Sequence, residues 1–360
     1  MSSPIPRSQT LDAARGMFML LGVVFHAALM YRDMDWVFRD GQTEQVFVHL
    51  ADALHIFRMP AFFWIAGYFC ATALLRNTLW NFAKRRFWRL AVPLIVLWPT
   101  LNFAQDWLVA TNRGETGWGV LTQGIGIHHL WFINNLLLYS LLAVLLLPSL
   151  RWLQSRSFVR LQAMTWWTAV GLSAIVSFAA WAAVRALQPD YMRSGYFGTP
   201  AEAFFYGSCF FLGLISAALP SFHRALMSCH PAWAPIAVTA AVWLNSFVYS
   251  HELFWVRELS LLLKLGCVWL AVGATIRLSV ALLRRAPRLT SHLAASSYTV
   301  YLAHLVLVVG FGVWFSHFNW CAVPKFFLVC LLSVSVSVAV HFLLVRRYRF
   351  FRVIFGGGPR

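Results

Sequence analysis

The sequence predicts an all-α polytopic membrane protein with about ten transmembrane helices. Of its 360 residues, 60% are hydrophobic and only 11% are charged, and the mean hydropathy is +0.67. A water-soluble domain needs a polar surface and does not reach such values. Apolar runs also recur along the whole chain at about the 20-residue length that a spanning helix requires. We therefore expect a single transmembrane domain over residues 1–360.

Ten runs are apolar enough to be spans, and each is bounded by charge, proline or glycine. They lie near 12–31, 48–75, 88–108, 129–149, 164–184, 202–220, 232–250, 257–276, 292–314 and 324–345. No connecting segment is long enough to fold as a soluble domain. The first run is not followed by a small-residue cleavage site, so we expect a retained helix and not a signal peptide.

The distribution of charge predicts the orientation. The formal net charge of +17 would suit a nucleic-acid-binding protein, but the positions of the basic residues follow the predicted spans. With ten spans, the side that holds both termini receives the basic runs 84–89, 284–288 and 346–352, while most of the twelve acidic residues lie on the other side. By the positive-inside rule both termini are cytoplasmic, and we expect the lipid bilayer, not nucleic acid, as the partner of these charges.

The six cysteines predict neither a disulfide framework nor a metal site. They are Cys70, Cys209, Cys229, Cys267, Cys321 and Cys330. They are scattered, mostly at membrane depth, and none forms a C-x-x-C pair. We expect no bound metal.

The first span carries Arg15 and His26 with no charge between them. Eleven residues turn an α-helix through about 1,100° and raise it about 16.5 Å, so the two side chains share one face. Ionisable groups inside spans are costly, which makes both candidates for function. The alternative is that Arg15 only anchors the helix end beside Asp12 and that His26 is a buried structural histidine.

The second span carries Asp52, His55 and Arg58 as a polar stripe at three-residue spacing. Asp52 and His26 lie about equally far from the outer ends of their helices. A carboxylate that orients an imidazole produces a general base, so we expect His26 as the base, oriented by Asp52. Arg58 or His55 would stabilise an oxyanion. The alternative is a mutually neutralised network that joins two helices.

A basic block follows the second span, in KRRFWRLAVP, with Arg85, Arg86 and Arg89 at a cytoplasmic helix end. Such a cluster often does no more than bind anionic lipid. It also suits a phosphate-rich ligand, because guanidinium groups pair with phosphate through two parallel hydrogen bonds.

Two further segments place polar groups at membrane depth. HHLWFINNLLLY brings His129 and Asn134 inward from an outer end, and SSYTVYLAH places Tyr298, Tyr301 and His304 three residues apart. A single histidine there would indicate packing, whereas three polar side chains on one stripe indicate a lined cavity.

Five blocks, taken together and in order, resemble the membrane-bound acyltransferase-3 family. They are LDAARG and, after nine intervening residues, His26, then FRMPAFFWIAGYF, RRFWRLAVP, HLWF and SSYTVYLAH. The resemblance extends over nearly the whole chain. It implies that His26 is catalytic with Arg15 as its companion, and that Arg85, Arg86 and Arg89 are the family's basic block. It also implies the stand-alone form, without a hydrolase domain after the tenth span.

The resemblance and the polar residues together predict an O-acyltransferase of the bacterial inner membrane. Acyl-CoA would be the donor substrate, with no permanently bound cofactor, and a hydroxyl of a periplasmic or cell-envelope glycan would accept a succinyl or acetyl group. The CoA phosphates should stay at the cytoplasmic arginines. Direct attack by the hydroxyl and an acyl-histidine intermediate both remain open. The alternative class is a proton-coupled transporter of a small solute.

Overall fold

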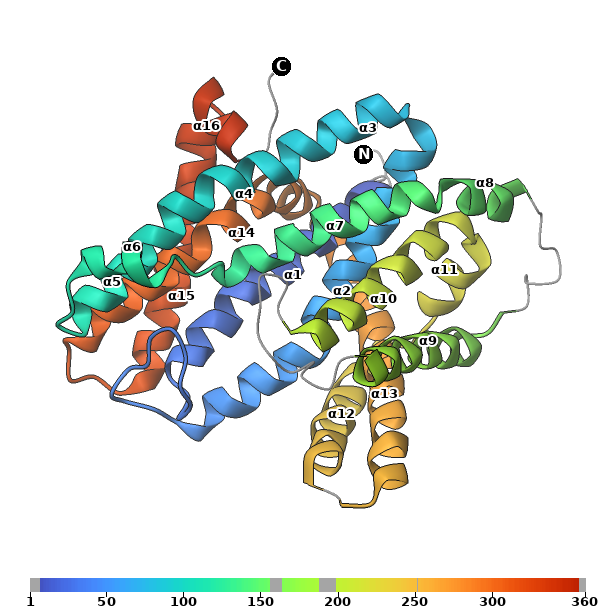
Figure 1. Cartoon of the computed structure of the whole chain (residues 1–360), viewed down its shortest axis with the longest axis horizontal. Helices are drawn as coiled ribbons and strands as arrows, with labels where there is room; N and C mark the ends of the chain where they lie inside the picture. Colours follow the sequence, from blue (N-terminus) through green and yellow to red (C-terminus); the bar gives the residue numbers. More distant parts are fainter. Residues whose placement is uncertain (1–6, 156–163, 188–198, 251, 356–360) are drawn as a thin grey trace. The chain divides into compact units, whose positions relative to one another are not determined.

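All regular secondary structure in the part of the chain that the structure describes is helical. The structure is a computed structural model and describes residues 7–155, 164–187, 199–250 and 252–355 (Figure 1). The helices are α1 (Arg7–Met30), α2 (Gln45–Arg76), α3 (Leu79–Arg86), η1 (Phe87–Ala91), α4 (Val92–Leu97), η2 (Trp98–Asn102), α5 (Phe103–Asn112), η3 (Gly117–Gly119), α6 (Val120–Gln123), η4 (His128–Leu130), α7 (Trp131–Leu145), α8 (Leu147–Ser155), α9 (Trp166–Leu187), α10 (Pro200–Ala218), α11 (Pro220–Leu226), α12 (Trp233–Ser250), α13 (Phe254–Arg284), α14 (Pro287–Ser316), α15 (Ala322–Val340), η6 (His341–Val345) and α16 (Arg349–Ile354). Helices satisfy their backbone hydrogen bonds internally, which is what a chain in lipid requires.

Nine helical segments in the described ranges are long and apolar enough to cross a membrane. They are Thr10–Met30, Gln45–Arg76, Leu79–Asn112, Gly117–Leu145, Trp166–Ala186, Pro200–Ala218, Phe254–Arg284, Pro287–Ser316 and Ala322–Val345. Each overlaps one of the ten predicted runs, which confirms an all-helical, multi-pass membrane protein. The remaining predicted run, 232–250, forms α12, whose apolar part Trp233–Val248 is shorter.

The chain divides into two compact units. Unit 1 comprises Met1–Ala14, His55–Ala83 and Asn135–Pro287. Unit 2 comprises Arg15–Leu54, Lys84–Asn134 and Arg288–Arg360. The boundaries fall inside α1, α2, α3, α7 and α14, so the units are not consecutive domains along the sequence.

In unit 2, α1 and α14 pack side by side and run in the same direction. Gly16 lies so close to α14 that an added Cβ would stand 2.9 Å from the carbonyl oxygen of Leu293. At the other end of α1, Met30 lies in the same way against Gly312. The residue numbers of the contacting positions increase in the same direction along both helices, so the helices are parallel. Buried valine, alanine and phenylalanine side chains of α1, α14 and α15 form the core around them.

This parallel pairing bears on the number of membrane crossings. Successive spans alternate in direction, so α1 and α14 are parallel only if both have odd numbers in the series of crossings. Counting the nine long segments alone makes α14 the eighth. Counting α12 as well makes it the ninth, and the 18 residues of α12 span about 27 Å, close to the hydrocarbon thickness. The pairing therefore favours the ten-span arrangement.

In unit 1, α2 and α10 cross at two glycines. An added Cβ at Gly67 would lie 1.9 Å from the carbonyl oxygen of Phe210, and one at Gly213 would lie 2.1 Å from that of Trp64. Small residues let membrane helices approach this closely. The Trp64 indole donates a 2.9 Å hydrogen bond to the Ser216 hydroxyl and ties the two helices together.

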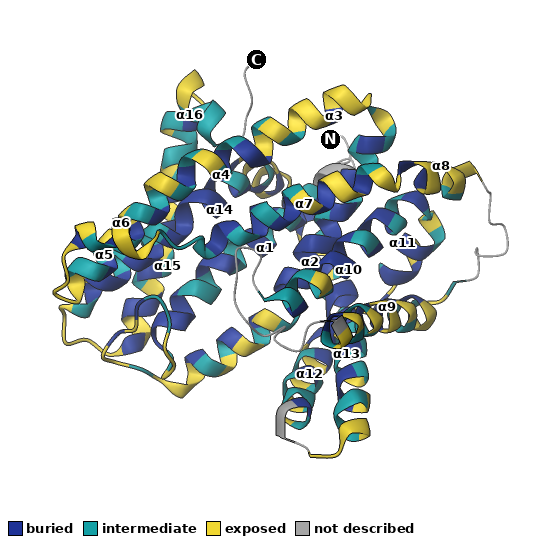
Figure 2. Cartoon of the chain, viewed as in Figure 1, coloured by how far each residue is buried: buried dark blue, intermediate teal, exposed yellow. Residues whose placement is uncertain are grey.

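Some helices of unit 1 expose apolar faces, as Figure 2 shows for α9. Trp167, Leu172, Ile175 and Val176 of α9 are exposed. A contiguous exposed apolar face on a spanning helix is the surface that contacts lipid.

Candidate active site

Helix α14 carries Tyr298, Tyr301 and His304 on one side. The rings of Tyr298 and Tyr301 stack with their centroids 6.4 Å apart. The centroids of Tyr301 and His304 are 5.9 Å apart. Residues three positions apart are neighbours on a helix surface, and the stripe that the spacing predicts is therefore formed.

Two histidines from other parts of unit 2 contact this stripe. The ring of His129, in η4, lies 5.1 Å from that of His304 and 5.4 Å from that of Tyr301. The ring centroid of His26, in α1, lies 5.2 Å from that of His304. We call Tyr298, Tyr301, His304, His129 and His26 the histidine–tyrosine row. It brings together residues that the sequence predicts for three separate spans.

Backbone carbonyls fix the tautomers of two of these histidines. Nδ1 of His304 donates a 2.6 Å hydrogen bond to the carbonyl oxygen of Tyr301, and Nε2 of His129 donates to that of Leu302 at 3.3 Å. A carbonyl only accepts, so the bonded nitrogen carries the hydrogen. In the neutral rings the lone pair is therefore on Nε2 of His304 and on Nδ1 of His129. Both side chains are buried, which gives the row proton-accepting nitrogens away from solvent.

The hydroxyl of Tyr301 connects the two histidine-bearing segments. It donates a 2.6 Å hydrogen bond to the carbonyl oxygen of His129. The ring of Phe132 packs edge-on against Tyr301 at 5.6 Å. The backbone of His129 is thereby held against α14, so the spacing of the rings in the row is set by a hydrogen bond as well as by packing.

At the Tyr298 end of the row lie Arg15, Arg86 and Arg89, which we call the arginine group. The guanidinium of Arg89 lies 5.5 Å from the centroid of the Tyr298 ring, and the Tyr298 hydroxyl donates a hydrogen bond to the Arg89 carbonyl oxygen. Arg15 and Arg86 are near enough to act on Tyr298 electrostatically. The row thus runs from guanidinium groups at one end to His26 at the other. The remaining predicted arginine, Arg85, is exposed.

The orientation of His26 by Asp52 remains a prediction, and the structure gives the surroundings of each residue. Asp52 is exposed on α2, next to the buried Ala51, because the buried face of this helix turn carries its apolar residues. Its electrostatic partner is Arg32. The His26 imidazole also stacks on the ring of Trp36, with centroids 5.6 Å apart and an angle of 19° between the ring planes.

Three other predicted residues are not members of the row. His55 and Arg58 belong to unit 1, where His55 is exposed and Arg58 is buried near enough to Tyr206 to act on it electrostatically. Asn134, in α7, is half-buried in unit 2. The predicted roles of these residues remain proposals.

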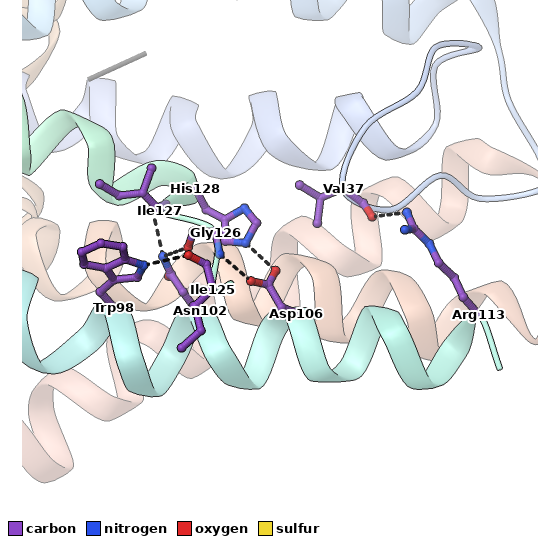
Figure 3. Close-up of polar contacts among 9 residues, drawn as sticks. All are labelled: Val37, Trp98, Asn102, Asp106, Arg113, Ile125, Gly126, Ile127 and His128. Carbon is purple, nitrogen blue, oxygen red and sulfur yellow. Dashed lines mark hydrogen bonds and ion pairs between the residues drawn. The ribbon is translucent and has the colours of Figure 1, made fainter. Parts of the chain in front are cut away.

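The segment just before His129 is held by side chains that the sequence analysis missed (Figure 3). Asp106 accepts hydrogen bonds from Nε2 of His128 at 2.5 Å and from the amide of Gly126 at 2.9 Å. Asn102 donates to the carbonyl oxygens of Gly126 and Ile127, both at 2.9 Å. These contacts hold His128 at a φ of 44°, a strained value for a residue other than glycine. The carboxylate–histidine pair of unit 2 is thus Asp106 with His128.

A second missed pair ties the loop between α1 and α2 to α15. Nζ of Lys325 lies 3.1 Å from both carboxylate oxygens of Asp40, and both side chains are 1% exposed. Burial raises the pKa of the neighbouring Tyr31 well above its usual range, and the Asp40 carboxylate adds to the rise, so Tyr31 stays neutral. Burial also lowers the pKa of Arg32, and nearby Asp52 opposes this change. The residues of these two pairs, Asp106 with His128 and Asp40 with Lys325, are not separated by a helical period. Only the folded structure therefore shows that they are paired.

This arrangement suits proton transfer beside an anionic ligand. Neutral, buried imidazoles accept and return protons, and guanidinium groups bind phosphate or carboxylate. Among the described residues, no group of three or more histidine, cysteine, aspartate or glutamate side chains is arranged to hold a metal ion.

The fold is that of a multi-pass membrane protein, and unit 2 brings histidine and tyrosine side chains from several helical segments together in the row. A family model described as an acyltransferase domain matches residues 9–342. The chain therefore belongs to the acyltransferase-3 family and is an acyltransferase, which requires an acyl donor and an acceptor. This assignment decides for an enzyme and against the transporter alternative.

Similar curated proteins are known from bacteria. Glucans biosynthesis protein C of Salmonella paratyphi B, of Salmonella dublin and of Salmonella typhi is in each case 26% identical over 377 aligned residues. The alignment covers 99% of this chain and 97% of each relative. No solved structure matches the chain.

Proposed function

We propose that the chain transfers an acyl group from cytoplasmic acyl-CoA to a hydroxyl of a periplasmic or cell-envelope glycan, in the inner membrane of a bacterium. The observation that carries the proposal is the histidine–tyrosine row, which links the arginine group to His26 within unit 2. An O-acyltransferase needs an anion-binding group for its donor and a base for its acceptor. The arginine group would supply the first, and His26, at the far end of the row, would supply the second.

The arginine group would bind the phosphates of the donor. CoA phosphates are excluded from hydrocarbon, so they stay at the cytoplasmic helix ends while the thioester extends into the bundle. Arg15 and His26 are eleven residues apart on the continuous helix α1, which is about 16.5 Å along its axis. This distance is comparable to the length of an extended pantetheine arm. Tyr298, held beside Arg89, would line the entrance for that arm.

His26 would act as the general base. A ring nitrogen accepts the hydroxyl proton while the acceptor oxygen attacks the thioester carbonyl carbon. The C–O bond forms, the C–S bond breaks, and the proton passes to the departing CoA sulfur. His304 contacts His26 directly and would position it, in the place that the sequence assigns to Asp52. Arg58 or His55 would stabilise the oxyanion, as the sequence predicts.

The acceptor class follows from the relatives. Their name assigns them to glucan biosynthesis, and we extend this to the present chain as a glucan or related envelope glycan. The transferred group is proposed to be succinyl or acetyl. Succinyl carries a further carboxylate, for which an arginine or lysine partner is required.

The test uses the purified full chain in liposomes with succinyl-CoA or acetyl-CoA and periplasmic glucan. We expect CoA release that depends on added glucan and an acyl ester on the glucan by mass spectrometry. His26→Ala should abolish both, whereas exchange of the exposed His292 on α14 for alanine should preserve them. CoA release that does not depend on any glycan would refute the acceptor class. Acyl label retained on the protein when glucan is omitted, and released by hydroxylamine, would establish the acyl-histidine route.

A further inference from the structure

Unit 1 contains a hollow that the acyl-transfer proposal does not use. Its cavity volume is about 300 Å³, and it is lined by Leu11, Tyr68, His223, Met227, Arg277, Val280, Ala281 and Arg284. All of these residues belong to unit 1. The hollow therefore lies outside the histidine–tyrosine row and needs its own explanation.

The charge of the lining has one sign. Its charged side chains are those of Arg277 and Arg284, and none of the lining residues is acidic. Guanidinium groups that line one concavity repel one another, and an anion relieves that repulsion. The sequence predicts that this end of α13 is cytoplasmic, where anionic lipid headgroups and soluble phosphates are both present.

The two arginines are set on one face of α13. Arg277 and Arg284 are seven residues apart, which is within about 20° of two full helical turns and about 10.5 Å along the axis. The guanidinium of Arg277 is held in place because its Nη1 donates to the carbonyl oxygens of Ser228 at 2.6 Å and Cys229 at 3.2 Å. Arg284 is exposed and can move toward a ligand.

Aromatic rings position His223 at the wall of the hollow. Its imidazole lies parallel to the Trp64 indole at 14°, with centroids 5.7 Å apart, and its centroid is 5.0 Å from that of Tyr68. The side chain is 9% exposed. A ring fixed in this way presents its polar edge without the entropic cost that a flexible side chain has to meet.

We propose that this hollow binds an anionic phosphate ester. Arg277, pre-positioned by two backbone carbonyls, and Arg284, free to close, hold the phosphate oxygens, and the ring of His223 with Tyr68 forms the wall. Guanidinium groups suit this ligand because they present paired N–H donors to phosphate oxygens. The phosphate can belong to the headgroup of an anionic phospholipid or to a water-soluble phosphate ester, which have the same binding chemistry.

The experiment compares the purified full chain with two single variants that remove the same charge. Arg284→Gln removes a lining guanidinium, and Arg285→Gln removes the next, equally exposed arginine, which does not line the hollow. Native mass spectrometry in a mixture of phosphatidylglycerol and phosphatidylcholine measures lipid binding. Equilibrium dialysis with adenosine 3′,5′-bisphosphate and with inorganic phosphate measures the soluble ligands.

We expect Arg284→Gln to weaken binding of one of these ligands about tenfold and Arg285→Gln to leave it unchanged. Loss confined to phosphatidylglycerol identifies a lipid headgroup as the source, and loss confined to the bisphosphate or phosphate identifies a soluble one. Arg277→Lys, which keeps the charge and loses the forked geometry, should have an intermediate effect. Equal effects of the Arg284 and Arg285 changes, or no effect of either in both assays, would overturn the proposal. Acyl transfer is not the readout, so failure here leaves the proposed function standing.

Discussion

The two units each bury histidine against aromatic rings, yet the surroundings of those histidines differ. In unit 2, His304 contacts two other histidines, and a backbone carbonyl fixes its tautomer. In unit 1, His223 is stacked on Trp64 beside a hollow lined by arginines. The first setting favours the exchange of protons between rings, whereas the second favours the binding of an anion. The neighbours of a buried histidine, and not its burial, therefore indicate its chemistry.

The largest effect is expected from breaking the row at its centre. His304→Asn keeps a polar side chain and removes the ring that contacts His26 and His129. Acyl transfer should fall about a hundredfold or more, because general acid–base groups contribute about 10² to 10⁴ in rate. Steady-state release of CoA measures this. His292→Asn, on the same helix but exposed, is the control, and equal activity of the two variants would contradict the role of the row.

The next prediction compares ion pairs in the two units. Lys325→Met leaves Asp40 buried without its ammonium partner, which should cost about 3 to 5 kcal/mol in the free energy of unfolding. Arg185→Met breaks the partly exposed pair with Glu258, where we expect about 1 kcal/mol or less. Thermal melting in detergent measures both. A melting temperature lowered equally by the two changes would mean that the Asp40 pair is not buried.

A smaller effect separates Asp106 and Asp52, two carboxylates of unit 2, as partners of the row. Asp106→Asn should lower turnover about tenfold, because it loosens the segment that positions His129 and leaves acyl-CoA binding little changed. Asp52→Asn should stay within about twofold of the original rate, since Asp52 is exposed beside Arg32. Separate measurement of kcat and KM distinguishes the two. A larger loss of turnover in Asp52→Asn than in Asp106→Asn would support the pairing of His26 with Asp52 that the sequence predicts.

The smallest effect concerns two cysteines. Burial raises the pKa of the Cys229 thiol to about 11, with Arg277 opposing the rise. Only about one thiol in a thousand is then ionised at pH 8, and because the thiolate is the nucleophile, alkylation should be slow there and should accelerate as the pH approaches 11. Cys321 of unit 2 is exposed and should react first. Peptide mass spectrometry after iodoacetamide treatment measures both, and rapid labelling of Cys229 at pH 8 would contradict the raised pKa of this thiol.

Patterns along single helices were predictable from the sequence because they depend on local geometry. The spans follow from hydropathy, and the stripe of Tyr298, Tyr301 and His304 follows from three-residue spacing. The same reasoning placed Asp52 beside His26 because both lie at similar distances from their helix ends. Equal depth says nothing about which way a side chain points, and in the folded chain Asp52 faces outward.

The sequence by itself determined that this is a multi-pass helical acyltransferase, because hydropathy and ordered motifs are properties of the chain alone. The tertiary structure decided which polar groups meet. It brought His26, His129 and His304 into contact from three helical segments, and it paired Asp106 with His128 and Asp40 with Lys325 across long separations in the sequence. It also aligned α1 with α14 in parallel, which favours a crossing at α12. Such pairings depend on how helices pack and rotate against one another, and a one-dimensional period carries no information about that rotation.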